Sequence, residues 1–441
     1  MTDSLQYLIY AAPLLLIWGL YVARQKRREK HSAETLGEAK EAGLTEPVSL
    51  HPLIDPNRCL GCGACVTACP EQPTHQVLGL IAGKAVLISP TDCIGHGACK
   101  VACPTDAITL VFGTETRGVT IPKLSKNFET SVPGIFVAGE LGGMGLIRNA
   151  LTQGRQAVEA VQERRAAQRG KPAAPIDLVI VGAGPAGFGA AVTATSLKMK
   201  FVVLEQESLG GCVYQYPRGK VVMTSPAELP IVGKIKFALT SKEDLLKFWQ
   251  EVEKKVGLKF NYYERVVAVE AQADGTFKVR TPKGLYHTTS VLLSIGRRGT
   301  PRKLGVPGEE LPKVVYRLID PQQYSGQHVL VVGGGDSALE AAASIAESGA
   351  ASVTLSYRGE AFGRAKARNR QRIVDAEQSG KLQILLNSQL RRIDKDAIMI
   401  EQQGRLTPLK NDSVIVNAGG VLPNDFLLSM GIAVETKYGT A

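Results

Sequence analysis

The chain has 441 residues, of which 44% are hydrophobic and 21% are charged, and it carries a formal net charge of +11. This composition is ordinary for a soluble α/β protein, and the length allows two or three domains. The positive charge can steer an acidic partner or an anionic cofactor, or it can belong to an ordinary solvated surface. No feature indicates a nucleic-acid-binding protein.

The N-terminal region begins with an uncharged stretch, residues 4–23, which contains no Asp, Glu, Lys or Arg. About 20 helical residues span the hydrocarbon core of a bilayer. Basic residues from Arg24 to Lys30 follow the stretch, the reverse of the order in a signal peptide. The positive-inside rule therefore predicts a single-pass anchor over 1–23 in the cytoplasmic (inner) membrane, with the N-terminus outside and the body in the cytoplasm. A buried or docking helix is the alternative. Residues 24–50 are predicted to form a basic, helical stalk.

Seven of the eight cysteines fall in residues 51–112, in two arrays. Residues 59–70 form a complete Cys-x2-Cys-x2-Cys-x3-Cys-Pro run, which is typical of bacterial-type ferredoxins with 4Fe–4S clusters. Residues 93–104 keep this spacing but have His96 where a cysteine would stand. The sequence therefore predicts a small α+β ferredoxin domain with two iron–sulfur clusters.

In two-cluster ferredoxins the fourth cysteine of each run binds the other cluster. This rule assigns one 4Fe–4S cluster to Cys59, Cys62, Cys65 and Cys103, and a second cluster to Cys69, Cys93 and Cys99, with His96 as candidate fourth ligand. A zinc site is disfavoured by three ligands in one tight turn, and a disulfide framework by the lack of other marks of secretion. A three-iron cluster without a fourth ligand, or a His96 that merely lines the loop, remains open.

Two dinucleotide-binding patterns follow. In the first, the apolar strand 177–182 runs into a G-x-G-x-x-G loop formed by Gly182, Gly184 and Gly187, and Glu205 ends the next strand. Such a loop places a pyrophosphate at a helix N-terminus, and the acid accepts hydrogen bonds from a ribose.

The second pattern begins with the strand 328–332, which enters a loop that contains Gly333, Gly335 and Ser337. No acid closes the next strand, and Arg358 stands there instead, with Arg364 shortly after. A missing acid with arginines nearby favours the 2′-phosphate of NADP over NAD. Surface ion pairs of these two arginines are the alternative.

Taken with their neighbours, these loops resemble the thioredoxin-reductase family of flavoproteins, which includes ferredoxin–NADP reductases. The motifs that carry the resemblance are GAGPAG, LGGCVYQYP, SIGRRGTPR, GGGDSALEAA and NAGGVLPNDFL. The resemblance covers roughly residues 113–441 and implies an α/β fold with two Rossmann-like domains, one for FAD and one for NAD(P). It implies that FAD is held by Gly182, Gly184, Gly187, Glu205, Gly210, Gly211, Gly296, Gly139 and Glu140, and the nicotinamide nucleotide by Gly333, Gly335, Ser337, Arg358 and Arg364.

One block of the family pattern is out of place. Residues 130–157 resemble the C-terminal flavin-binding segment of the family, yet they precede the first glycine loop, so the chain looks circularly permuted. Glu140 stands where the family has Asp. The predicted domains are a permuted FAD segment over 113–173, an FAD-binding domain over 174–300, an NAD(P)-binding domain over 301–420 and a return segment over 421–441.

The redox Cys-x-x-Cys of thioredoxin reductases is missing before the second glycine loop, which excludes disulfide reduction by that mechanism. Cys212 stands alone near the expected flavin ring, as a reactive thiol or as an inert small side chain. The expected function is a membrane-anchored oxidoreductase that passes electrons from NAD(P)H through FAD to the clusters and an external carrier, or in reverse. Ferredoxin, flavodoxin and a quinone-linked protein are the expected carriers, and a homodimer is allowed. A disulfide reductase that uses Cys212 and a non-catalytic membrane redox sensor or scaffold are the alternatives.

Overall fold

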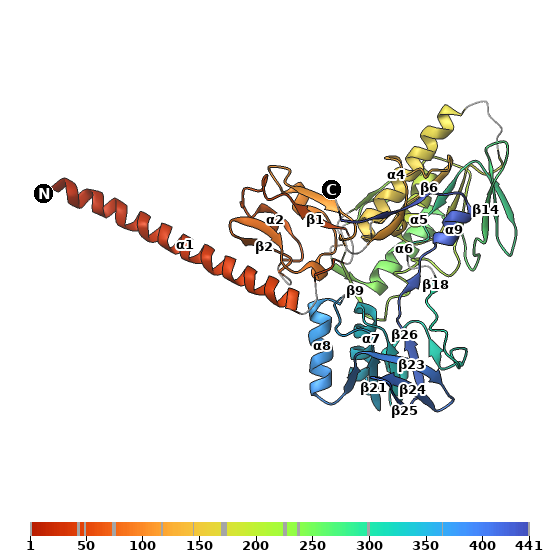
Figure 1. Cartoon of the computed structure of the whole chain (residues 1–441). Helices are drawn as coiled ribbons and strands as arrows, with labels where there is room; N and C mark the ends of the chain where they lie inside the picture. Colours follow the sequence, from red (N-terminus) through yellow and green to blue (C-terminus); the bar gives the residue numbers. More distant parts are fainter. Residues whose placement is uncertain are drawn as a thin grey trace. The chain divides into compact units, whose positions relative to one another are not determined.

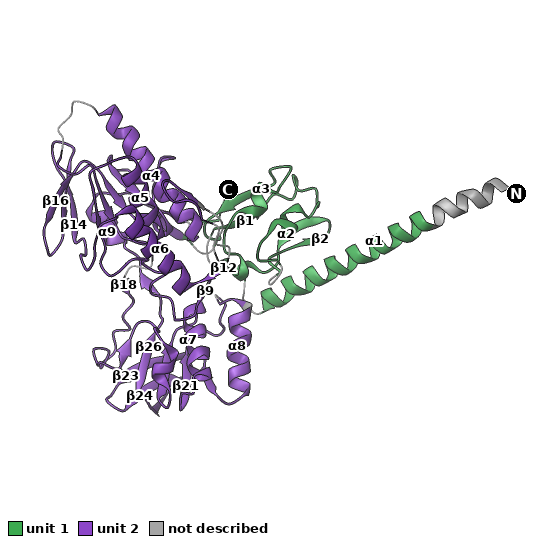
Figure 2. Cartoon of the chain, turned by 180° about the vertical axis from the view of Figure 1, so that it is seen from behind, with its two compact units in different colours: residues 1–118, 438–441 green, residues 119–437 purple. Residues whose placement is uncertain are grey.

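The computed structural model describes residues 2–41, 45–47, 50–72, 76–115, 118–143, 145–168, 174–223, 227–235, 239–297, 300–363 and 365–439. The chain forms two compact units (Figure 2). Unit 1 comprises residues 1–118 and 438–441, and unit 2 comprises residues 119–437.

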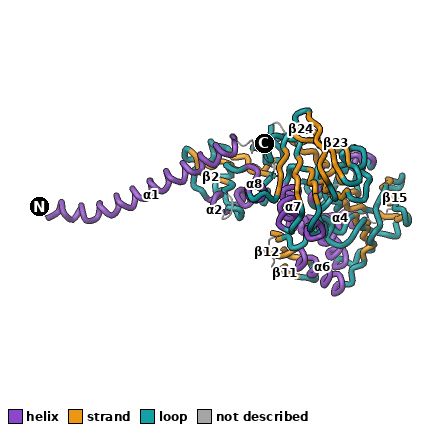
Figure 3. Tube along the Cα trace, turned by 90° about the horizontal axis from the view of Figure 1, so that it is seen from below, coloured by secondary structure: helices purple, strands orange, loops and turns teal. Residues whose placement is uncertain are grey.

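Unit 1 begins with one unbroken helix, α1 (Thr2–Glu41), which is seen most clearly in Figure 3. Its C-terminal half packs against the rest of unit 1, because Ser32 and Ala39 are buried. The Glu29 carboxylate also accepts a hydrogen bond of 3.3 Å from the amide of Gly83. This half of α1 is therefore a docked helix and not a free stalk.

The predicted membrane anchor is wrong. Among the residues that the structure describes, no helix has a segment long and apolar enough to cross a membrane. The predicted single-pass topology and membrane localisation depended on this anchor and are therefore wrong as well.

The remainder of unit 1 is built from two antiparallel strand pairs and short helices. Its core contains five buried cysteines together with apolar side chains such as Val77 and Leu78. The strand β1 pairs with β4, and β2 pairs with β3. The elements are β1 (His51–Ile54), α2 (Ala64–Ala68), β2 (Leu78–Ile81), β3 (Lys84–Leu87), η1 (Pro90–Asp92), α3 (Ala98–Val101) and β4 (Ile108–Val111).

Unit 2 contains a first parallel sheet with the strand order β13-β8-β7-β17-β6. Its edge strand β6 is labelled in Figure 1. Every residue of β7 is buried, as expected for a central parallel strand that is covered on both faces. At the edge, β6 pairs with β17, although β6 precedes the first glycine loop in the sequence. The strands are β6 (Ile135–Val137), β7 (Leu178–Val181), β8 (Phe201–Leu204), β13 (Phe260–Asn261) and β17 (Val291–Leu293).

Helices cover one face of this sheet, and a small antiparallel sheet covers the other. The helix α6 begins where the Ser241 hydroxyl accepts a hydrogen bond of 3.0 Å from the Asp244 amide, and it ends at Gly257, whose φ is 70°. The covering elements are α4 (Ile147–Ala167), α5 (Pro185–Ser196) and α6 (Lys242–Val256) on one face, and β14 (Ala268–Ala271), β15 (Phe277–Arg280) and β16 (Leu285–Thr288) on the other.

A second parallel sheet of unit 2 has the order β19-β26-β20-β21-β22 and repeats this arrangement of layers. One face packs against helices and the other against a second antiparallel sheet. Its strands are β19 (Val314–Val315), β20 (His328–Val332), β21 (Ser352–Ser356), β22 (Leu382–Leu385) and β26 (Ser413–Val416), covered by α7 (Asp336–Glu347), α8 (Ala367–Gln378), β23 (Ser388–Ile393), β24 (Ala397–Gln402) and β25 (Arg405–Lys410). The predicted mixed α/β, Rossmann-like architecture is confirmed.

Short elements join the two layered halves of unit 2. The strand β18 (Thr300–Pro301) pairs with β27 (Gly420–Val421) where the chain enters and leaves the second half. The Arg317 guanidinium donates two hydrogen bonds of 3.0 Å to Glu207 of the first half. The other elements are β5 (Val119–Pro122), η2 (Glu140–Gly142), β9 (Val221–Met223), β10 (Ala227–Leu229), β11 (Gly233–Ile235), β12 (Leu239–Ser241), η3 (Pro321–Tyr324), α9 (Asn424–Ser429) and β28 (Val434–Lys437).

The contact between α4 and α5 leads to a stability prediction. A Cβ added at Gly154 of α4 would overlap the carbonyl oxygen of Ala186 in α5, so the two helices cannot keep their spacing in a Gly154→Ala variant. We expect this variant to lower the free energy of unfolding by about 1–3 kcal/mol, measured by urea denaturation with circular dichroism. Gly37→Ala in α1, where no atom lies within 4 Å of the added Cβ, is the control and should not destabilise the protein. Equal stability of both variants would contradict the described packing.

Candidate functional site

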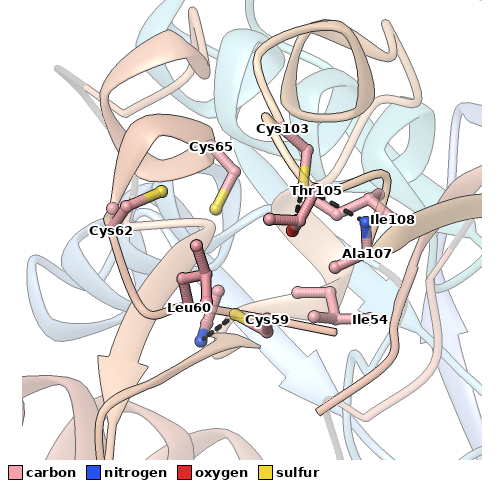
Figure 4. A pocket seen from close by; sticks show the side chains of 11 residues that line it. Ile54, Cys59, Leu60, Cys62, Cys65, Cys103, Thr105, Ala107 and Ile108 are labelled. Carbon is pink, nitrogen blue, oxygen red and sulfur yellow. Dashed lines mark hydrogen bonds between the residues drawn. The ribbon is translucent and has the colours of Figure 1, made fainter. Parts of the chain in front are cut away.

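Four thiols of unit 1 surround one hollow (Figure 4). Cys59, Cys62 and Cys65 come from the first array, and Cys103 comes from the second. The structure thus brings together the four residues that the crossing rule assigns to one cluster, and their ligation of iron stays a prediction. Among the described residues, no three His, Cys, Asp or Glu side chains are grouped tightly enough to hold a single metal ion.

The Cys103 sulfur has several hydrogen-bond donors around it. The Ala107 amide donates to Cys103 Sγ at 3.3 Å, and the Thr105 hydroxyl lies 3.6 Å from the same sulfur. Burial alone would raise the pKa of Cys103, but hydrogen bonds from Thr105 and Ala107 outweigh it, so the pKa is lowered. The surroundings of Cys103 therefore favour its thiolate, which is the form that binds metal, whereas burial raises the pKa of Cys65 in the same hollow to about 11.

The hairpin between β2 and β3 provides similar support to Cys59. The Ala85 amide donates to Cys59 Sγ at 3.4 Å, and the Lys84 ammonium donates to the Cys59 carbonyl at 2.7 Å. The cysteine spacing did not indicate Lys84 and Thr105 as members of this site. For Lys84 the sequence holds no signal, because its position depends on how the hairpin folds back onto the first array.

The second group of thiols consists of Cys69, Cys93 and Cys99, all of which are buried. Burial raises the pKa of Cys93 to about 11, and the nearby charges of Cys99 and Cys69 add to the rise. The three thiols therefore lie within electrostatic reach of one another. Burial lowers the pKa of His96, while the charge of the buried Glu71 opposes this shift. The sequence analysis also missed Glu71.

The first glycine loop of unit 2 has the geometry of a phosphate cradle. A Cβ at Gly182 would approach the Ser294 carbonyl oxygen to 2.6 Å, and one at Gly187 would overlap the Gly182 carbonyl oxygen. At Gly184, in contrast, the nearest atoms to an added Cβ are 4.0 Å away, which leaves this point of the loop open. The helix α5 starts directly after Gly184, and none of the described side chains caps its N-terminus. An anion such as a pyrophosphate fits this position.

Glu205 lies at the end of β8 and is 5% exposed. Its carboxylate accepts hydrogen bonds from the amides of Ala183, at 2.6 Å, and Glu207, at 2.8 Å. Burial raises the pKa of Glu205, although these amides oppose the shift. Each carboxylate oxygen keeps a second lone pair, which can accept a hydrogen bond from a ribose hydroxyl.

The other residues assigned to FAD gather around the same loop. The Gly210 amide donates to the Ala183 carbonyl at 2.9 Å, and a Cβ at Gly211 would lie 3.1 Å from the Cα of Gly184. A Cβ at Gly139 would lie 3.0 Å from that of Ala186, so the segment that carries Gly139 also reaches this loop.

Around this loop, the Gly139 amide donates to the Gln153 side chain at 2.9 Å, a contact that the sequence did not indicate. Glu140 follows Gly139 and begins η2. A Cβ added at Gly296 would lie 3.9 Å from Cys212 Sγ. The thiol therefore lies beside the segment that follows β17.

In the second glycine loop, as in the first, there is open space around the second glycine of the motif. No atom lies within 4 Å of a Cβ added at Gly335, which precedes α7. Gly333 approaches the Asn417 carbonyl too closely for a side chain, and the ring of Tyr357 covers Gly334 in the same way. No sequence pattern indicated Tyr357, because its ring reaches the loop only through the pairing of β20 with β21.

The polar residues assigned to the nicotinamide nucleotide lie at this end of the second sheet. Ser337 is exposed in the first turn of α7, and Arg358 is exposed two residues after β21. Arg358 forms no ion pair with any described residue, so the surface ion pair considered for it is not formed there. Arg364 lies outside the described residues.

Known proteins resemble both parts of the chain. Residues 179–440 match the family described as pyridine nucleotide-disulphide oxidoreductase, and residues 51–104 match a 4Fe-4S dicluster domain. A ferredoxin–NADP reductase from Ignicoccus hospitalis is 31% identical over 268 residues, which are 59% of this chain and 83% of that protein. A bacilliredoxin reductase from Bacillus subtilis is 27% identical over 267 residues, 59% of this chain and 82% of that protein.

Among solved structures, a bacillithiol disulfide reductase from Bacillus cereus aligns with a TM-score of 0.53 at 26% identity, over 58% of this chain and 82% of that chain. The predicted resemblance to the flavoprotein family and the predicted iron–sulfur domain are therefore confirmed. The number of clusters and the preference for NADP stay predictions. The chain belongs to the pyridine nucleotide-disulphide oxidoreductase family, as an FAD-dependent oxidoreductase that also carries a 4Fe-4S dicluster domain.

Proposed function

We propose that this protein moves electrons between NAD(P)H, FAD and two iron–sulfur clusters, and exchanges them with an external one-electron carrier such as ferredoxin. The observation that carries the proposal is the hollow lined by Cys59, Cys62, Cys65 and Cys103, in a chain that also has two dinucleotide-type loops. FAD, when bound, exchanges hydride with a nicotinamide and single electrons with iron–sulfur clusters. Relatives named ferredoxin–NADP reductases support ferredoxin as the carrier, in either direction of flow.

The FAD site is proposed to lie at the first glycine loop. The open position at Gly184 suits the pyrophosphate, and the buried Glu205 suits the adenosine ribose. The remaining proposed contacts come from loops that approach this point, at Gly139, Glu140, Gly182, Gly187, Gly210, Gly211 and Gly296.

We further infer that the chain is circularly permuted relative to its family. Residues 105–178 lie outside both matched ranges, and they include β6 and α4. The pairing of β6 with β17 and the packing of α4 on α5 support the view that this segment completes the FAD-binding half. Chain termini that lie near each other make such a rearrangement compatible with one fold.

For the nicotinamide nucleotide we propose Gly333, Gly335, Ser337 and Arg358, with Arg364 retained from the sequence. Arg358 is exposed and without an ion pair among the described residues, so its charge is available to a ribose 2′-phosphate. This arrangement supports NADPH over NADH.

A disulfide reductase is the second candidate, because relatives named bacilliredoxin and bacillithiol disulfide reductases match the same half of the chain. Cys212 is the thiol that such a reaction would use. Its position near Gly296 is compatible with either role.

Anaerobic titration with NADPH tests the proposed function. We expect NADPH to bleach the flavin within seconds and then to produce the paramagnetic signal of a reduced cluster.

A Cys65→Ser variant should keep flavin reduction and lose one cluster signal, because Cys65 lines the hollow. A Cys212→Ser variant should reduce ferredoxin as fast as the parent. Loss of acceptor reduction in that variant would favour the disulfide reductase, and a flavin that stays oxidised with both NADPH and NADH would indicate a non-catalytic protein.

Removal of the Glu205 carboxylate should weaken FAD binding. Hydrogen bonds to charged groups are worth about 1.5–3 kcal/mol, so Glu205→Ala should raise the FAD Kd roughly 10- to 100-fold. Fluorescence titration of the FAD-free protein measures this change, and Glu205→Gln, which keeps the shape, should show an intermediate value. Glu251→Ala, an exposed position on α6, is the control. An unchanged Kd in both Glu205 variants would remove Glu205 from the proposed site.

Loss of Arg358 should change the choice of nucleotide. We expect Arg358→Ala to raise the KM for NADPH roughly 10- to 100-fold and to leave the KM for NADH unchanged, because only NADPH carries the 2′-phosphate. Steady-state reduction of ferricyanide measures both values. Arg405→Ala, at another exposed arginine, should change neither value. Equal effects of Arg358→Ala on both nucleotides would argue against the assignment.

A further inference from the structure

The two cysteine arrays fold into matching loops. The N-cap of α2 is Gly63, with φ 74° and ψ 4°, and the N-cap of α3 is Gly97, with φ 75° and ψ 4°. The glycines two positions earlier in the sequence also both have positive φ, 68° and 77°. Because the backbones match, His96 occupies in the second loop the place that Cys62 occupies in the first.

The first loop shows where a side chain at this place points. Cys62 lines the hollow together with Cys59 and Cys65 of the same array (Figure 4). The corresponding neighbours of His96 are Cys93 and Cys99, which are 8% and 6% exposed. The His96 side chain therefore leaves the backbone at the position from which, in the first loop, the Cys62 side chain reaches the hollow.

The imidazole of His96 has an unsatisfied buried nitrogen. His96 Nε2 is inaccessible to solvent and has no hydrogen-bond partner among the described residues. A buried polar atom without a partner costs about 1–3 kcal/mol, and native structures normally avoid it. A bound metal removes this cost, since the neutral imidazole nitrogen is a good ligand for iron.

We propose that His96 Nε2 is the fourth protein ligand of the second iron–sulfur cluster and completes a set with Cys69, Cys93 and Cys99. This proposal rests on the proposed function, which supplies the cluster. Of the alternatives, a three-iron cluster without a fourth ligand or a His96 that only lines the loop would leave the buried Nε2 unpaired.

Ligation by His96 makes the two clusters chemically different. A neutral imidazole in place of a thiolate makes a cluster one charge less negative, and histidine ligation raises cluster potential. The cluster of His96 is therefore the one that accepts an electron first. The cluster with four cysteines is the more strongly reducing centre.

Pulsed electron paramagnetic resonance on the full chain tests this assignment. The protein is isolated anaerobically with its histidines labelled with nitrogen-15 and reduced with dithionite, so that the readout does not depend on electron delivery from NADPH. We expect nitrogen-15 coupling to one cluster in the parent protein and none in His96→Cys and His96→Ala. The His96→Cys variant should keep about eight iron atoms per chain, and its altered cluster should have a more negative midpoint potential.

The control is His51→Gln, a buried histidine of unit 1 that lies outside both cysteine arrays and should keep the nitrogen coupling. A reduced cluster without nitrogen-15 coupling in the parent overturns the ligation by His96. So does an oxidised three-iron signal with about seven iron atoms per chain. These results would leave the proposed function intact, whereas a protein without iron and sulfide would overturn both.

Discussion

The burial of thiols in unit 1 is the constraint on which this part of the molecule depends. Cys59, Cys65, Cys69, Cys93 and Cys99 lie in the core, where a domain of this size would normally place aliphatic side chains. A domain of roughly 60 residues buries little apolar surface, so bound metal can supply a large part of its folding free energy. The helix α1 adds to this core by burying Ser32 and Ala39 against unit 1.

Unit 2 depends on a different constraint, the close approach of backbones at glycine. Gly182 and Gly187 bring β7, α5 and the end of β17 together, and Gly154 brings α4 onto α5. The chain reaches β7, α5 and β17 in this order, with further elements between α5 and β17, whereas α4 comes from a segment that precedes all three. The layers of this half are therefore held together by close packing at small residues, and the proposed circular permutation is compatible with that packing.

The sequence predicted the features that local spacing encodes and missed those that depend on tertiary folding. The glycine loops and Glu205 follow a short-range pattern, and Cys103 joins the first array through a rule about repeats. Lys84 and Tyr357 reach their sites only after strands have paired, so no local pattern marks them. The membrane helix was wrong because an uncharged stretch does not by itself distinguish a lipid-facing helix from one that continues into a docked segment.

Both thiol sites have to accommodate buried negative charge. In the first, the amides of Ala85 and Ala107 donate to the sulfurs of Cys59 and Cys103, the Thr105 hydroxyl lies beside Cys103 Sγ, and the Lys84 ammonium donates to the Cys59 carbonyl. In the second, burial raises the pKa of the Cys93 thiol, and Glu71 adds a buried carboxyl group. Burial also raises the pKa of Cys65 in the first site to about 11, so both sites disfavour thiolates, and a neutral imidazole at His96 lowers the number of anionic ligands in the second site. The change from cysteine to histidine thus fits the electrostatics of the site in which it occurs.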